Sequence, residues 1–178
     1  LIIICSVAFV IQESTVRVST SYTNEFIRPV NGLGSYTFLT ISLLKDKSEV
    51  WRLVTYQFAH GGIGHLFLNM WALFMFGRPV EDRIGRRRFL LLYFLSGVAG
   101  ALIWMAANLM HPEAFKLPLV GASAAVMGVI AAAAFLYPKS RVLLLIPPMV
   151  VKLRTLAIII VASDVILYVA TIFLMLTI

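Results

Sequence analysis

The amino-acid sequence predicts an all-α membrane protein, a polytopic helical bundle that forms a single transmembrane domain over residues 1–178. Of the 178 residues, 61% are hydrophobic and only 13% are charged, whereas soluble domains carry about 25% charged residues. The same composition excludes a disordered chain, which needs low hydrophobicity and high net charge. Apolar runs near the bilayer-spanning length of about 20 residues alternate with short basic loops.

Five crossings are expected, at residues 1–11, 61–77, 89–110, 117–137 and 155–178. The second is short and carries His65 and Asn69, so hydropathy alone ranks it below the three that follow. The first is apolar from its first residue and reads as the rear half of a helix whose front part is missing. Both ends of the domain are therefore expected to be truncated. Residues 142–150 are too short to span a bilayer, and we interpret them as an interfacial connector.

The distribution of charge predicts the orientation. Nine of the fifteen Lys and Arg residues lie in the loops after the second and fourth crossings: Arg78, Arg83, Arg86, Arg87, Arg88, Lys139, Arg141, Lys152 and Arg154. The positive-inside rule places both loops and the amino terminus in the cytoplasm, and the expected membrane is a bacterial inner membrane. This function in orientation explains the net charge of +7 without a nucleic-acid partner. Residues 12–60 then lie outside, where their aromatic and aliphatic residues favour a hairpin resting partly in the outer leaflet.

Three polar side chains are expected at a similar depth, just below the outer surface. His65 and Asn69 stand four residues apart and share one helix face, and Ser123 lies near the outer end of the fourth crossing. Polar groups inside a membrane are costly, so each needs a partner or a function. Taken singly, each has a structural explanation: a serine bonds its own backbone, and a His–Asn pair joins helices. Their common depth favours a functional site without deciding the matter.

Small residues surround Ser123, in the order Gly121, Ala122, Ala124, Ala125 and Gly128. Ala124 and Gly128 have the spacing of four that allows two helices to pack closely. The same lack of bulk lets a substrate backbone approach the hydroxyl of Ser123. Free N–H groups at a helix amino terminus stabilise an oxyanion, so packing and catalysis are compatible here.

These residues resemble the rhomboid family of intramembrane serine proteases over most of the chain. Trp51 and Arg52 match the family's Trp-Arg dipeptide, and His65-x-x-x-Asn69 matches its His–Asn motif, with His60 at the position of an upstream histidine. GASA at residues 121–124 corresponds to Gly-x-Ser-Gly, with Ala124 in place of the usual Gly. The resemblance implies a bacterial-type six-helix core whose sixth helix is expected beyond residue 178.

The resemblance also implies a chemistry. Ser123 would be the nucleophile of a Ser–His dyad, with the histidine on the sixth helix, while His65 and Asn69 would stabilise the oxyanion. The implied substrates are transmembrane proteins cut near the outer leaflet. Besides these substrates and the lipid bilayer, no partner is implied, and neither a cofactor nor a metal ion is expected.

Three alternatives remain open. An inactive rhomboid-like protein would bind transmembrane segments without cutting them. Two features allow this alternative: the dyad histidine is missing from the sequence, and Ala124 stands in place of the usual glycine. A small transporter would need internal repeats and broken helices at the midplane, and the sequence displays neither. A passive membrane assembly subunit leaves the convergent polar residues unexplained. The protease is the preferred interpretation, and the alternatives follow in the order given.

Overall fold

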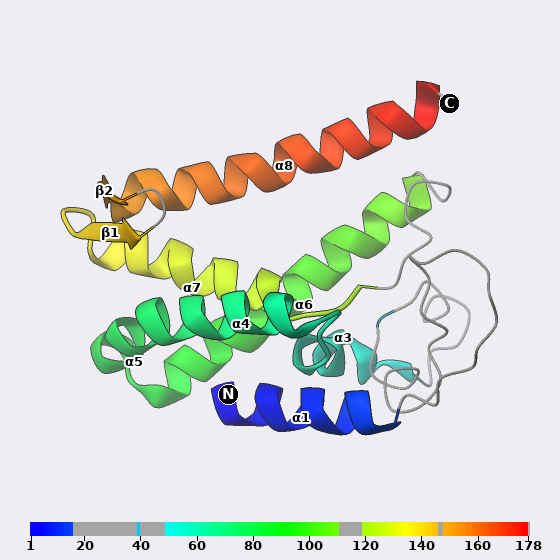
Figure 1. Ribbon diagram of the computed structural model, residues 1–178, viewed down its shortest axis with the longest axis horizontal. Coiled ribbons are helices and arrows are strands. Elements are labelled where there is room, and N and C mark those ends of the chain that lie inside the picture. The colour runs from blue at the N-terminus through cyan, green and yellow to red at the C-terminus, as the bar shows by residue number, and fades with distance from the viewer. Residues whose placement is uncertain (16–38, 40–48, 111–118, 146–147, 178) are drawn as a thin grey trace.

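The computed structural model describes residues 1–15, 39, 49–110, 119–145 and 148–177, and it is mostly helical (Figure 1). In chain order the elements are α1 (Ile2–Thr15), α3 (Arg52–Thr55), η3 (Tyr56–Phe58), α4 (Ile63–Ala72), η4 (Leu73–Gly77), α5 (Arg78–Ile84), α6 (Arg86–Met110), α7 (Ser123–Leu136), β1 (Arg141–Leu145), β2 (Pro148–Lys152) and α8 (Leu153–Thr177).

Helix α7 is the centre of the bundle. It packs along α6, and it also contacts α4, η4, α5 and α8. Because its sequence is built from alanine, glycine and valine, neighbouring helices approach it closely, and Ala125, Val129 and Ala133 are buried. Helix α1 lies at the edge of the bundle, against η3 and α4 (Figure 1).

The second predicted crossing is part of a longer helical segment. Residues 61–77 were expected to form it, but α4, a π-helical turn (η4) and α5 follow one another without a break from Ile63 to Ile84. Hydropathy missed the final part because α5 is polar and carries Arg78, Glu81, Asp82 and Arg83. The helix ends at Gly85, whose φ of 83° belongs to the left-handed region that glycine tolerates.

Helix α7 begins at Ser123 rather than at residue 117, so the predicted start of the fourth crossing is wrong. Leu119 forms an isolated antiparallel bridge with Leu39, and their backbone N–H···O distances are 3.1 and 2.8 Å. Gly121 then reverses the backbone with a φ of 105°. A bridge at Leu119 and a turn at Gly121 therefore precede the helix, although these residues are as apolar as those of α7.

The segment interpreted as an interfacial connector, residues 142–150, lies in an antiparallel hairpin. Strand β1 pairs with β2 so that Arg141 lies opposite Lys152 and Leu143 lies opposite Val150. The other predicted crossings lie close to observed helices: residues 89–110 lie within α6, residues 155–178 overlap α8, and residues 1–11 overlap α1. The expected outer-leaflet hairpin falls mostly on residues 16–38 and 40–48, which lie outside the described residues.

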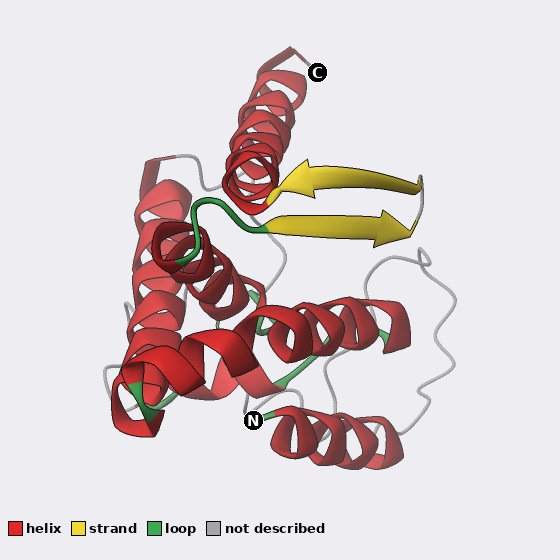
Figure 2. Cartoon of the chain, turned by 90° about the vertical axis from the view of Figure 1, so that its left-hand side faces the viewer, coloured by secondary structure: helices red, strands yellow, loops and turns green. Residues whose placement is uncertain are grey.

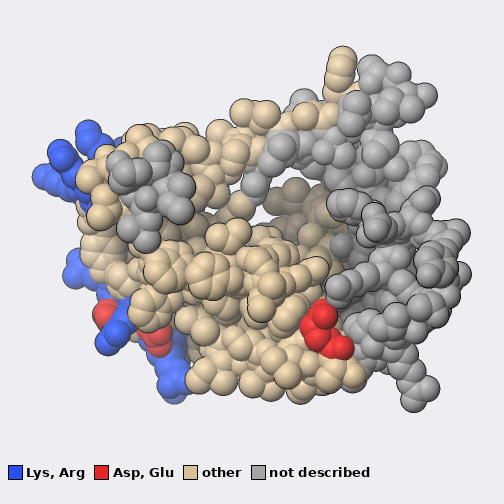
Figure 3. Space-filling model, in the orientation of Figure 1, with Lys and Arg blue, Asp and Glu red and all other residues tan. Residues whose placement is uncertain are grey.

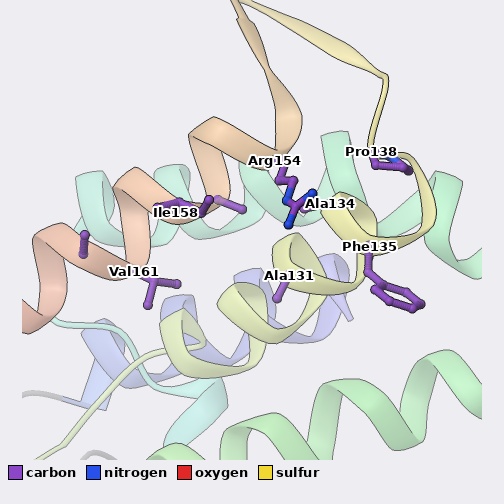
Figure 4. Close-up of a pocket in the computed structure, with 9 residues that line it drawn as sticks. Ala131, Ala134, Phe135, Pro138, Arg154, Ile158 and Val161 are labelled. Atoms are coloured by element: carbon purple, nitrogen blue, oxygen red, sulfur yellow. The ribbon is translucent and has the colours of Figure 1, made fainter.

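Among the described residues, α6 alone is both long and apolar enough to be a candidate membrane span, and the apolar stretches of α1, α7 and α8 are shorter. Five crossings therefore stay a prediction. The Lys and Arg side chains gather at one end of the molecule, around α5 and the hairpin (Figure 3). Helix α8 leans away from the bundle, and a groove of about 690 Å³ separates it from α7 (Figure 4).

Candidate active site

Ser123 is the first residue of α7, and its side chain is half-buried. The backbone turns into the helix at Gly121, two residues earlier, where the imidazole of His65 lies against the chain. A Cβ atom on Gly121 would stand 2.5 Å from Cε1 and 2.9 Å from Nε2 of His65. Two features therefore require glycine at position 121: its φ of 105° and its contact with the imidazole ring of His65. The structure brings His65 of α4 beside the residues that lead into Ser123.

Asn69 lies one turn after His65 on α4 and is buried. Its Nδ2 donates a hydrogen bond of 2.9 Å to the carbonyl oxygen of His65. An amide nitrogen carries two N–H groups, so this bond leaves one donor for an external acceptor. Asn69 can therefore offer a donor on the same helix face as His65. Its function as an oxyanion donor stays a prediction.

His60 lies in the turn before α4, outside the helices expected to cross the membrane, and is fully buried. Gln12 of α1 holds its backbone with two hydrogen bonds: Nε2 of Gln12 donates to the carbonyl oxygen of His60 at 2.7 Å, and the N–H of His60 donates to Oε1 of Gln12 at 3.2 Å. The two bonds fasten α1 to the start of the segment that carries His65. Gln12 was placed in an outer loop by its sequence context, so its structural function was missed.

The ring of His60 packs edge-on against that of His65, with 5.4 Å between the ring centroids. Its Nδ1 lies 3.3 Å from the carbonyl oxygen of Phe58, and its buried Nε2 has no hydrogen-bond partner in the described part of the chain. Burial lowers the pKa of His60 to about 4; the carbonyl of Phe58 opposes this shift and His65 adds to it. His60 is therefore neutral near pH 7.

Tyr56 joins the site to α6. Its hydroxyl donates a hydrogen bond of 2.6 Å to the carbonyl oxygen of Gly97, and its own carbonyl oxygen accepts one of 3.0 Å from the N–H of Gly121. Nothing in the spacing of aromatic residues pointed to this function. Nearby, Arg52 is buried and forms an ion pair of 2.9 Å with Glu49, whereas the side chain of Trp51 is exposed.

The small residues that follow Ser123 pack against α6. A Cβ atom on Gly100 would overlap the methyl group of Ala124, and one on Gly128 would overlap the hydroxyl of Ser96. The packing interpretation of this small-residue pattern is therefore correct for Ala124 and Gly128. It leaves Ser123 itself at the open, amino-terminal end of α7, where the helix has free N–H groups.

The structure thus places the imidazole of His65 against the turn that precedes Ser123, with the amide of Asn69 one turn further along α4. A serine hydroxyl is a weak nucleophile and needs a neighbouring base. The side chain of His60 is fully buried, and the imidazole of His65 lies against the backbone of Gly121. The third histidine, His111, lies outside the described residues.

Comparisons with known proteins identify the relatives of the chain. The sequence pattern of the rhomboid domain matches residues 47–175. The chain is 42% identical to Rhomboid-like protease 3 of Toxoplasma gondii over 82 residues, which are 46% of this chain and 29% of that protein. It is 32% identical to Rhomboid protease GluP of Bacillus subtilis over 122 residues, 65% of this chain and 23% of that protein.

A third relative has a different description. The chain is 38% identical to Inactive RHOMBOID-like protein 8 of Arabidopsis thaliana over 64 residues, 36% of this chain and 18% of that protein. The chain thus spans less than a third of the length of each of these relatives. Two of these relatives are therefore described as proteases and one as inactive.

Proposed function

Since the chain belongs to the rhomboid family, whose members are integral membrane proteins, we propose that it is an intramembrane serine endopeptidase that cuts transmembrane proteins near the outer leaflet. The observation that carries this proposal is the contact between His65 and Gly121, which sets an imidazole beside the turn that leads into Ser123. A histidine that served only for packing would not need to lie beside a serine at the amino terminus of a helix.

In the proposed mechanism the hydroxyl oxygen of Ser123 attacks the carbonyl carbon of a substrate peptide bond. A histidine on the sixth helix, expected beyond residue 178, takes the hydroxyl proton and returns it to the leaving amine. The resulting acyl-enzyme is hydrolysed by water. The backbone N–H of Ser123 and the side chains of His65 and Asn69 donate hydrogen bonds to the oxyanion, where one such donor contributes about 2.7–4 kcal/mol.

The proposed membrane arrangement has five crossings in this chain, formed by α1, by the helix that runs through α4, by α6, by α7 and by α8. The basic end of the bundle, seen in Figure 3, faces the cytoplasm or the equivalent compartment of an organelle. Ser123 is then expected near the opposite surface of the membrane. Because relatives occur in a bacterium, a plant and Toxoplasma gondii, the bacterial inner membrane is one of several possible locations.

A second candidate function is that of an inactive rhomboid-like protein that binds transmembrane segments. The similarity to Inactive RHOMBOID-like protein 8 favours it, as does Ala124 in place of the usual glycine. The packing of Ala124 weakens the support that this residue gives. The methyl group of Ala124 fits against Gly100 on α6, in space that a side chain at position 100 would need, so alanine is accommodated here.

The deciding experiment uses the full-length protein in liposomes with a transmembrane substrate and a serine-directed fluorophosphonate. Ser123→Ala is expected to abolish cleavage and labelling. Ser163→Ala is a matched control, because the hydroxyl of Ser163 is exposed on α8 and donates only to the carbonyl oxygen of Ile160, at 2.7 Å. His65→Ala and Asn69→Ala are expected to lower the rate but to retain some labelling, since nucleophile and base survive.

The outcomes separate the two candidates. Full cleavage by a stably folded Ser123→Ala protein would refute the assignment of the nucleophile. A folded wild-type protein that neither cleaves nor reacts, although the sixth-helix histidine is present, would establish the inactive relative instead. Thermal stability must be measured for His65→Ala and Asn69→Ala, because buried polar groups also stabilise the fold.

A further inference from the structure

The β1–β2 hairpin differs from every other element of the described chain because it extends sideways from the bundle. Figure 1 shows the strands foreshortened at the end of α8, and Figure 2, turned by 90°, shows them nearly at full length. The strands therefore run across the direction of α8. If α7 and α8 cross a membrane, a hairpin between their basic ends lies parallel to the membrane surface.

The hairpin exposes apolar side chains. Leu143 and Val150 are directly opposite each other, on one face of the ribbon, and their exposed fractions are 58% and 59%. Met149, on the other face, is 48% exposed. A two-stranded ribbon is only marginally stable in water, and exposed apolar groups usually mark a contact with another apolar phase.

Positive charges flank these apolar residues. Arg141 and Lys152 face each other at the open end of the hairpin, and both are exposed. Like charges at directly opposite positions destabilise a strand pair unless an anion lies between them. Neither side chain forms an ion pair within the described ranges, although Asp82 lines the same hollow as Arg141.

The surrounding surface has the same sign. Lys139 and Arg154, just outside the hairpin, are also exposed, and Figure 3 shows Lys and Arg side chains concentrated at this end of the molecule. Cations beside exposed aliphatic side chains, at the level of the bilayer surface, match the chemistry of anionic phospholipids: the headgroup binds the cations and the acyl chains surround the apolar residues.

We propose that the β1–β2 hairpin anchors the protein in the leaflet on its basic side. Leu143 and Val150 lie among the acyl chains, and Arg141 and Lys152 bind the headgroups of anionic phospholipids. The occupant of this surface is the lipid rather than a protein, because in the proposed membrane arrangement the hairpin directly joins two crossing helices. A short turn separates it from the end of α7 at Leu136, and α8 begins directly after Lys152. This inference does not depend on whether Ser123 is a nucleophile.

The test measures the depth of the hairpin in the full-length protein. Cys5, the only cysteine, is replaced by Ala, and an environment-sensitive fluorophore is attached through Val150→Cys. The protein is reconstituted in phosphatidylcholine liposomes with and without phosphatidylglycerol. A reporter at Arg83→Cys, also exposed at the basic end but on α5, is the matched control.

With phosphatidylglycerol present, we expect a blue shift at position 150 and quenching by lipids with a nitroxide on the acyl chain, whereas position 83 is quenched by aqueous iodide. Arg141→Glu combined with Lys152→Glu should abolish the shift, and Arg141→Lys should preserve it. High salt should reduce it in the wild type. Unchanged unfolding temperatures would exclude a folding defect as the cause.

Two outcomes would overturn the proposal. Quenching of position 150 by iodide in both lipid compositions would leave the hairpin in water, available to a protein partner. Equal insertion in pure phosphatidylcholine, unaffected by the charge reversal, would refute the function of anionic headgroups. Both readouts are independent of cleavage, so they remain informative if the protein is inactive.

Discussion

The methyl group of Ala124 on α7 lies directly against Gly100 on α6, in space that any side chain at position 100 would need. Ala124 follows Ser123 by one residue, so this contact between the two helices lies in the first turn of α7. The resemblance to the rhomboid family implies Gly at position 124; in this chain the methyl group of Ala124 fits because residue 100 has no side chain.

This close contact makes Gly100→Ala a severe substitution. It should destabilise the protein by about 1–3 kcal/mol, the usual cost of overpacking, and lower fluorophosphonate labelling of Ser123. Adding Ala124→Gly in the same chain should restore much of both. Gly64→Ala is the matched control, because a Cβ atom there meets no atom within 4 Å. Thermal unfolding of the single and double variants measures the coupling, and additive effects would contradict the predicted contact.

Gly121→Ala should be damaging for a different reason. Alanine at a φ of 105° is strained by about 1–3 kcal/mol, and its Cβ atom would displace the imidazole of His65. Labelling of Ser123 should fall more than stability does. The control is Gly62→Ala, where φ is 168°, an extended conformation, and no atom lies within 4 Å of the added Cβ. Normal labelling in Gly121→Ala would show that the position of His65 is unimportant.

Gln12→Ala should loosen the contact between α1 and the segment before α4. It leaves the buried N–H and C=O groups of His60 without the side chain that satisfies both, and an unsatisfied buried polar group costs about 1–3 kcal/mol. Ser14→Ala on the same helix removes only an exposed local bond to the carbonyl oxygen of Ile11 and should have little effect. Unfolding temperatures of both variants check this, and similar values would contradict it.

The buried ring of His60 predicts a dependence of stability on pH. Its pKa is about 4 in the folded protein and about 6.5 in the unfolded chain, so the unfolded state binds more protons between these values. The contribution of His60 to the free energy of unfolding should therefore be fully present above pH 6.5 and should decrease as the pH falls towards 4. The imidazole faces His65 and the carbonyl of Phe58, with Gln12 on its backbone.

Unfolding temperatures measured across this range in detergent test the prediction. His60→Gln should be less stable than the wild type at neutral pH and should depend less on pH. An identical pH dependence in the two proteins would assign the effect to other groups.

The proposed orientation predicts opposite accessibility for two exposed positions. In a Cys5→Ala background, Val50→Cys should react with a membrane-impermeant maleimide from the outer side, and Arg87→Cys only after the membrane is opened. Labelling of position 87 in intact cells would overturn the arrangement.

The sequence predicted the long apolar helices well, because α6 and α8 are continuous runs whose ends coincide with charged or polar residues. It failed where tertiary contacts decide the backbone. Leu119 is apolar like α7, yet its bridge to Leu39 and the turn at Gly121 delay the helix until Ser123. The hairpin was missed because short apolar runs have no periodicity that separates a strand from other buried segments.

The site was predictable in part for the same reason. The spacing of His65 and Asn69 is a local property of a helix, so the sequence was sufficient to place them on one face. The contacts of Gln12 with His60 and of Tyr56 with Gly97 join residues separated by 48 and 41 positions, and no local pattern encodes them.

The hydrogen bond from the N–H of Gly121 to the carbonyl oxygen of Tyr56 also constrains the order in which the fold assembles during synthesis. A ribosome makes Tyr56 and His65 long before it makes Gly121, and a growing chain that lacks residue 121 cannot close this bond. The imidazole of His65 then has no backbone to rest against. The surroundings of Ser123 therefore form only after the start of α7 has been made and has packed against the earlier helices.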